Sequence, residues 1–146
     1  MKQNPEARAT AFHPASAPDY IPAPLLRDLQ LKRLQAIVRR AYERVELFRE
    51  RLKERGIVPD DIQSLGDIAR LPFTVKNDLR DTYPFGLFAS PLEEIVRLHA
   101  SSGTTGKPIV VAYTKEDVEV WTSVMVRTLA SFGLGHGDVI QNSYGY

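Results

Sequence analysis

One short segment constrains this chain more than any other part of its sequence: the residues SSGTTGKP at positions 101–108. A strand-like apolar stretch stands on each side of it, at 95–99 and at 109–113. Glycine lets the backbone curl closely around a ligand, and hydroxyl, backbone N–H and ammonium groups all bind oxyanions. The segment therefore predicts a loop between two strands that holds a nucleotide polyphosphate. The predicted phosphate ligands are Ser101, Ser102, Gly103, Thr104, Thr105, Gly106 and Lys107.

This loop is not a Walker A motif, which has four residues between its first glycine and its Gly-Lys pair, whereas this chain has two. The alternative interpretation is a Ser/Gly-rich hairpin turn that binds nothing. The length of the segment, its density of hydroxyl groups and its terminal lysine favour phosphate binding over that alternative.

Composition sets limits on the class of protein. The 146 residues are 43% hydrophobic and 25% charged, as in an ordinary globular domain, and a net charge of +1 predicts neither a nucleic-acid nor a membrane partner. There are no cysteines, which excludes disulfides and thiolate metal sites. No segment has the length and apolarity of a signal peptide or a membrane span, so a soluble, cytoplasmic protein is expected.

The first half of the chain predicts an arm and a long helix. Residues 1–24 carry five of the ten prolines and are expected to form an extended N-terminal arm. Residues 25–54 have helical periodicity, and Gly56 is the expected stop. The predicted buried face comprises Leu34, Ile37, Val38, Ala41, Val45, Phe48 and Leu52. The predicted solvated face comprises Arg39, Arg40, Glu43, Arg44, Glu46, Arg49, Glu50, Arg51 and Glu54.

Residues 57–94 predict short capped helices. Ser64 stands three residues before Asp67, and Ser90 stands three before Glu93, as in capping boxes. Thr74 is expected to cap a short helix at 75–80. The segment 83–88 is an aromatic loop, for which packing is favoured over recognition.

The order of elements after the loop is that of an α/β protein. Thr114 is expected to cap a helix of about eighteen residues that ends at Gly133. Its predicted buried face comprises Val118, Trp121, Met125, Leu129 and Phe132. A turn at 135–138 and a strand at 139–143 follow. Because the sequence stops directly after that strand, we expect it to be the N-terminal piece of a longer polypeptide.

These motifs, taken in order, resemble those of the phenylacetate–coenzyme A ligases, a family of the adenylate-forming superfamily. The matching segments are RAYE at 40–43, LPFTVKNDLR at 71–80, YPFGL at 83–87, HASSGTTGKP at 99–108 and YGY at 144–146. The resemblance covers residues from about 25 to the end. It implies that residues 25–146 are an incomplete AMP-binding domain, the N-terminal portion of the large domain of an adenylate-forming enzyme.

The resemblance implies a two-step reaction that consumes ATP. Phenylacetate or a similar aryl acid is activated as an acyl-adenylate, pyrophosphate leaves, and coenzyme A then takes the acyl group and releases AMP. The loop from Ser101 to Lys107 would hold the β- and γ-phosphates, with Mg²⁺ bridging phosphate oxygens. One departure from the wider superfamily is that Ile109, rather than a lysine, follows the proline, while Lys107 precedes it.

The remaining sites are less specific. Tyr144, Gly145 and Tyr146 are candidates for the wall of the aryl-acid pocket, with core packing as the equal alternative. Lys76 is a further substrate candidate, although a lysine in the first turn of a helix is commonly just solvated. No residue of the chain is assigned as catalytic or as a metal ligand.

The later motifs of the family lie outside these residues, so the chain alone is expected to be inactive. Two alternatives stay open: an adenylate-former of the coenzyme F390 synthetase type, and a non-catalytic phosphate-binding or assembly module. A homodimer is also left open.

Overall fold

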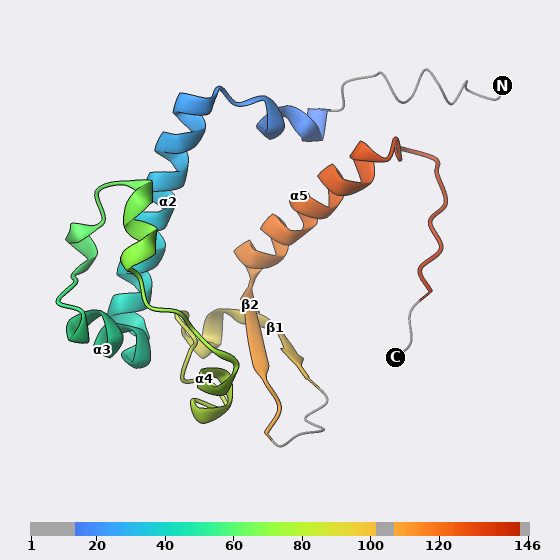
Figure 1. Cartoon of the computed structure of the whole chain (residues 1–146). Coiled ribbons are helices and arrows are strands. Elements are labelled where there is room, and N and C mark those ends of the chain that lie inside the picture. The colour runs from blue at the N-terminus through green and yellow to red at the C-terminus, as the bar shows by residue number, and fades with distance from the viewer. Residues whose placement is uncertain (1–13, 102–106, 144–146) are drawn as a thin grey trace. The chain divides into compact units, whose positions relative to one another are not determined.

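The computed structural model describes residues 14–101 and 107–143, which form helices and one pair of strands (Figure 1). Residues Pro22–Asp117 form one compact unit, and the described residues 14–21 and 118–143 belong to a second. In chain order the elements, with short 3₁₀ helices labelled η, are η1 (Pro14–Tyr20), α2 (Ala23–Arg44), α3 (Glu46–Glu54), η2 (Pro59–Asp61), η3 (Leu65–Arg70), α4 (Lys76–Asp81), η4 (Leu92–Glu94), β1 (Ile95–Ala100), β2 (Val110–Thr114) and α5 (Lys115–Ser131).

The predicted extended arm is wrong for residues 14–20, which form the 3₁₀ helix η1, while the rest of the arm before it lies outside the described residues. The long helix predicted for 25–54 is also wrong as a single element. It breaks at Val45, which has an extended conformation (φ −115°, ψ 106°) between α2 and α3 (Figure 1).

The core explains why the helix breaks. In one straight helix, Leu52 would lie about 21 Å from Val38 along the axis, at 1.5 Å per residue. In the structure both side chains are fully buried in one cluster with Ile57 and Ile62. The bend at Val45 brings α3 back toward α2 and so buries apolar surface that a straight helix would leave in water. The periodicity is the same on both sides of the break, so the sequence pattern did not reveal it.

The end of α3 follows the prediction. Gly56 has a φ of +65°, which a side chain would resist, and the backbone N–H of Ile57 donates to the carbonyl oxygen of Leu52 at 2.9 Å. This reversal turns the chain so that Ile57 and Ile62 pack against the two helices.

Five turns among the described residues share the same hydrogen bond to an aspartate side chain. In each, a backbone N–H donates at 2.8 Å to the carboxylate of an aspartate three residues further on. The pairs are Val58–Asp61, Ser64–Asp67, Val75–Asp78, Thr114–Asp117 and Gly135–Asp138. Each carboxylate satisfies a donor that a helix or turn start would otherwise leave exposed or unpaired.

The predicted caps at Ser64 and Thr114 are therefore confirmed. The predicted cap at Thr74 is wrong by one residue, because Val75 precedes the first turn of α4 and its N–H is the one bound by Asp78. The predicted box from Ser90 to Glu93 is wrong as well. There Pro91 precedes η4, with no side-chain cap.

The two predicted strands are confirmed to within a residue at each end. β1 and β2 pair antiparallel, with His99 opposite Val111 and Ala100 opposite Val110. The register shifts between Ile95 and Arg97, which marks a bulge near the start of β1. The pair is a hairpin whose connection carries the predicted phosphate loop.

The helix α5 confirms the predicted element but not its predicted burial. Gly133 ends it with a φ of +78°, as expected. No residue of α5 is buried, and Trp121 and Met125 are 41% and 48% exposed. Phe132, just after the helix, is 77% exposed. Apolar side chains occur around much of this helix, so a single inward stripe does not describe it.

The predicted turn at 135–138 is confirmed, since the N–H of Asp138 donates to the carbonyl of Gly135. The predicted strand at 139–143 is wrong: these residues form no strand, and Val139 is 96% exposed. A strand requires a neighbouring strand for its backbone hydrogen bonds, and the described residues give this segment none. None of the helices in the described part of the chain is long and apolar enough to cross a lipid bilayer.

Candidate functional site

The base of the predicted phosphate loop is closed by two hydrogen bonds between Ser101 and Ile109, which we call the loop clamp. The backbone N–H of Ser101 donates to the carbonyl oxygen of Ile109 at 3.0 Å. The backbone N–H of Ile109 donates to the Oγ of Ser101 at 2.9 Å. The Ser101 hydroxyl oxygen thus accepts one bond, and a hydroxyl that accepts a bond still carries an O–H group that can act as a donor.

Lys107 lies inside the loop clamp, two residues before Ile109, and its side chain is exposed. Its Nζ is 6.0 Å from the centroid of the Tyr83 ring, at the outer range of a cation–π contact. Tyr83 belongs to the aromatic loop between α4 and η4. The sequence predicted packing for that loop and did not connect it with Lys107.

The other predicted loop ligands, Ser102, Gly103, Thr104, Thr105 and Gly106, lie outside the described residues. The three candidates for the acid pocket, Tyr144, Gly145 and Tyr146, lie outside them too. The structure describes Ser101 and Lys107 at the two ends of the predicted loop, and every phosphate-ligand assignment stays a prediction.

Lys76, the remaining candidate, is the first residue of α4 and is exposed. His99 lies on β1 with its ring 5.1 Å from that of Tyr113 in an edge-on arrangement, a packing contact within the hairpin. In the part of the chain that the structure describes, no group of three or more His, Asp or Glu side chains could hold a metal ion.

An ion pair between Arg51 and Asp78 joins α3 to α4. Both terminal nitrogens of Arg51 donate to the carboxylate of Asp78, at 2.6 and 2.7 Å, and Asp78 is only 7% exposed. The bond from Arg51, together with the N–H of Val75, holds the pKa of Asp78 below its usual value. The same bond raises the pKa of Arg51. The prediction that Arg51 belongs to the solvated face of the long helix is therefore wrong.

The sequence contained a signal for one member of the Arg51–Asp78 pair, which the sequence analysis did not identify. The spacing between Val75 and Asp78 is that of a helix start, which could have marked Asp78 as a cap. Nothing in the sequence pattern pairs Asp78 with an arginine that comes 27 residues earlier. Arg51 is one of several charged residues of α3, and nothing in the sequence distinguishes it from the others.

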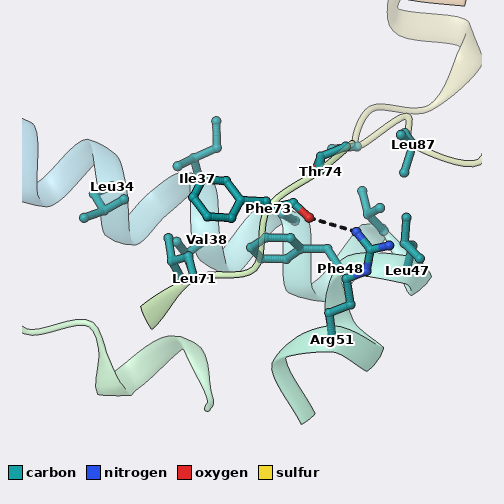
Figure 2. Close-up of a pocket in the computed structure, with 13 residues that line it drawn as sticks. Leu34, Ile37, Val38, Leu47, Phe48, Arg51, Leu71, Phe73, Thr74 and Leu87 are labelled. Carbon is teal, nitrogen blue, oxygen red and sulfur yellow. Dashed lines mark hydrogen bonds between the residues drawn. The ribbon is translucent and has the colours of Figure 1, made fainter. Parts of the chain in front are cut away.

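An apolar hollow of about 380 Å³ lies between α2, α3 and the segment that leads into α4 (Figure 2). Its walls include Val38, Phe48 and Leu71, and Figure 2 shows the Phe73 ring beside them with the Arg51 guanidinium at one end. Arg51 also donates to the Phe73 carbonyl at 2.9 Å. Three N–H donors of the Arg51 guanidinium are thus bonded within the protein, which holds this group in a structural role.

The resemblance predicted from the sequence is confirmed by comparison with curated proteins. The phenylacetate-coenzyme A ligase of Pseudomonas putida is 54% identical over 121 residues, which are 83% of this chain and 28% of that protein. The enzymes of the same name from Thermus thermophilus and Escherichia coli are 52% and 46% identical over 126 and 121 residues. The chain spans only 28% of the length of each of these relatives. No protein-family model matches the chain.

Solved structures agree on the fold. A 2-hydroxyisobutyryl-CoA ligase, in complex with 2-HIB-AMP and CoA in the thioesterification state, superposes with a TM-score of 0.75 at 30% identity. The match covers 89% of this chain and 30% of that one. The same ligase in the postadenylation state with 2-HIB-AMP gives a TM-score of 0.73 at 27% identity. The α/β class predicted from the sequence fits these neighbours and the mixture of helices and strands in the structure.

Proposed function

We propose that this chain contributes the phosphate loop of an ATP-dependent aryl-CoA ligase, with phenylacetate or a similar aryl acid as the substrate. The observation that carries the proposal is the 54% identity to a phenylacetate-coenzyme A ligase over 83% of this chain. The neighbouring structures with 2-HIB-AMP and CoA support an acyl-adenylate chemistry followed by transfer to CoA.

In the proposed reaction a carboxylate oxygen attacks the α-phosphate of ATP, and the bond to the β-phosphate breaks to release pyrophosphate. The thiol of coenzyme A, losing its proton, then attacks the acyl carbon, and AMP leaves. The residues of this chain, Ser101 to Lys107, bind the β- and γ-phosphates and stabilise the negative charge that moves onto pyrophosphate. Two observations support this assignment: Ser101, whose Oγ accepts the N–H of Ile109, stands at one end of the loop, and the exposed Lys107 stands at the other.

The donor set of the loop also fits a role for Mg²⁺. Hydroxyl groups and one ammonium group bind phosphate oxygens but leave several negative charges, which a divalent cation bridging the phosphates would neutralise. The chain itself offers no assigned ligand for the ion, so its binding would depend on the phosphates and on residues outside this chain. The acid pocket is proposed to include Tyr144, Gly145 and Tyr146, with Lys76 as a weaker candidate.

The test begins with the intact mass of the protein expressed from its own gene. A product much heavier than the 16.4 kDa of this sequence is expected, because the relatives are longer. That product should release pyrophosphate only when ATP and an aryl acid are present, and should form a CoA thioester. The 146-residue chain alone is expected to do neither.

Three outcomes would contradict the proposal. A native product of 16.4 kDa would favour the non-catalytic phosphate-binding module. Pyrophosphate release without thioester formation would favour transfer of AMP to another acceptor. Thioester formation with 2-hydroxyisobutyrate but with no member of an aryl-acid panel would reject the aryl substrate class while retaining the ligase chemistry. Size-exclusion chromatography of the same product would test whether it is a homodimer.

A further inference from the structure

The contact between Lys107 and Tyr83 joins two segments that are far apart in the sequence. Lys107 is the last of the predicted loop ligands, and Tyr83 lies in the turn after α4. The Nζ of Lys107 is 6.0 Å from the centroid of the Tyr83 ring. The negative face of a tyrosine ring attracts an ammonium group at such a distance, so the contact favours particular positions of a long, flexible side chain.

The turn that carries Tyr83 is tightly built. The N–H of Gly86 donates to the carbonyl oxygen of Thr82 at 2.8 Å, which closes the turn around Tyr83. A Cβ atom on Gly86 would lie 2.8 Å from both that oxygen and the Cβ of Thr82, so only glycine allows this approach. The backbone of the turn from Thr82 to Gly86, which carries Tyr83, is therefore closely constrained.

Hydrogen bonds also connect the turn that carries Tyr83 to α4 and to α3. The hydroxyl of Thr82 donates to the carbonyl oxygen of Asp78 at 2.6 Å. The carboxylate of Asp78 takes two bonds from Arg51, and Arg51 stands beside the fully buried Leu52 on α3. A continuous set of bonds thus runs from the helical core to the turn that holds the ring.

Lys107 has its own fixed point. It stands at the end of the loop, two residues before Ile109, which is held by both hydrogen bonds of the loop clamp. The backbone near Lys107 is thereby tied to the strands, while the four-carbon side chain beyond it can rotate. The Tyr83 ring is the described group that meets this side chain at its charged end.

We propose that Tyr83 is a positioning residue, which orders the Lys107 ammonium group before a nucleotide polyphosphate arrives. The proposal rests on the proposed function, since it concerns the same phosphate site. Ordering the lysine in advance removes part of the entropy loss that binding would otherwise cause, and so it lowers the Michaelis constant for ATP. Once ATP is bound, its phosphates themselves hold the Lys107 ammonium group, so the loss of the Tyr83 ring leaves the turnover number almost unchanged.

The contact can be tested by NMR on the 146-residue chain, with no nucleotide. The ε-methylene protons of Lys107 should be shifted upfield by the ring current of Tyr83. Tyr83→Phe, which keeps a ring and removes only the hydroxyl, should retain the shift, and Tyr83→Leu should abolish it. Phe85→Leu, in the same turn, is the matched control and should leave the Lys107 shift in place. The thermal unfolding of Phe85→Leu and of Tyr83→Leu should be compared with that of the wild type to confirm that both variants fold.

The functional part is tested by kinetics of the native gene product. Tyr83→Leu should raise the Michaelis constant for ATP by about two- to five-fold, the range of an exposed cation–π contact, while the turnover number changes less than two-fold. Tyr83→Phe should behave as the wild type. In a Lys107→Ala background, Tyr83→Leu should have no further effect, because the ring then has no cation to position.

The outcomes separate the two proposals. An unshifted Lys107 signal in the folded wild type overturns the positioning contact whatever the enzyme does. An effect of Tyr83→Leu that is equally large in the Lys107→Ala background overturns it as well, since that result indicates a general effect on the turn. Absence of ATP turnover in the wild type, together with a normal ring-current shift, overturns the proposed function and with it the nucleotide role of Tyr83.

Discussion

Lys107 is the charged residue that the sequence and the structure both place at the mouth of the hairpin. In the native gene product, Lys107→Ala should cost about 1–3 kcal/mol of ATP binding, the value of a hydrogen bond to a charged group. The Michaelis constant for ATP should therefore rise by roughly five- to 150-fold. Lys32→Ala, which removes an exposed lysine from α2, is the control and should leave the constant unchanged. Equal kinetics for the two variants would mean that Lys107 does not bind phosphate.

Asp78 is the residue that joins α3, the start of α4 and the turn after α4, through its bonds with Arg51, Val75 and Thr82. Asp78→Asn removes the charge that Arg51 binds and leaves a half-buried guanidinium with weaker acceptors. We expect a clear fall in the midpoint of thermal unfolding. Asp60→Asn removes the charge from a bond of the same 2.6 Å length, but between the exposed side chains of Arg39 and Asp60. It should cost at most about 1 kcal/mol, as exposed pairs do. Equal destabilisation by Asp60→Asn and Asp78→Asn would show that the burial of Asp78 does not make its ion pair more important than the exposed one.

At the scale of elements, the aspartates that begin the turns make the stability depend on acid. Hydrogen bonds from Ser64, Arg51 and Thr114, respectively, lower the pKa values of Asp67, Asp78 and Asp117 below the ordinary 3.8. In the folded chain these groups hold protons less tightly than in the unfolded chain. Their contribution is therefore complete above about pH 5 and is lost as the pH falls below 3.8 and through the folded-state pKa values.

Urea unfolding between pH 7 and pH 2 should show this dependence: a plateau at the upper end and a fall at the lower end. The Asp78→Asn variant should fall less steeply, because one of the titrating groups has been removed. A wild-type stability that rises as the pH drops below 3.8 would contradict the proposed sign.

The start of α5 allows a separate test of how much such an aspartate-containing cap stabilises a helix. The hydroxyl of Thr114 accepts the N–H of Asp117 at 3.2 Å and donates to its carboxylate at 2.8 Å. Thr114→Ala should destabilise the first turn by about 0.5–2 kcal/mol, which hydrogen exchange of the amides there would measure. Thr122→Ala is the control: Thr122 lies in the middle of α5 and donates to Val118, and alanine favours a helix there. Equal losses of protection would mean that the cap is not the cause.

Most elements could be predicted from the sequence because their signals are local. The stop at Gly56, the caps at Ser64 and Thr114, and the two strands each depend on residues within one turn or one strand. The break at Val45 could not be predicted, because its cause is the core that Val38 and Leu52 share only after the chain has bent. The failed strand at 139–143 has the same origin, since a strand depends on a neighbour that its own residues do not specify.

At the scale of the whole molecule, stability should be unevenly distributed. The buried residues Val38, Leu52, Ile57 and Ile62 all lie in the Pro22–Asp117 unit, while α5 has no buried residue. Amides of α2 and α3 should therefore exchange with solvent more slowly than those in the second half of α5. Measurement of hydrogen exchange by NMR tests this order. Slower exchange in α5 than around Leu52 would show that α5 is stabilised by contacts outside the described core.

The candidate site shows the same division between local and distant information. The sequence identified Ser101 and Lys107 as loop residues through their composition and spacing, and the resemblance to phenylacetate-coenzyme A ligases is confirmed. It gave no sign that Tyr83 would meet Lys107 or that Arg51 would meet Asp78. These contacts join segments whose approach depends on tertiary packing, which single-sequence periodicity does not contain.

The loop clamp has a consequence for how such a chain can diversify. The strand register is set by the pairing below Ser101 and Ile109 and by the two bonds between them, all of which lie outside the segment that they enclose. Substitutions or changes of length within that segment are thus insulated from the sheet. Under the proposed function, changes within the segment would alter which anion is bound while the hairpin that presents the segment stays the same.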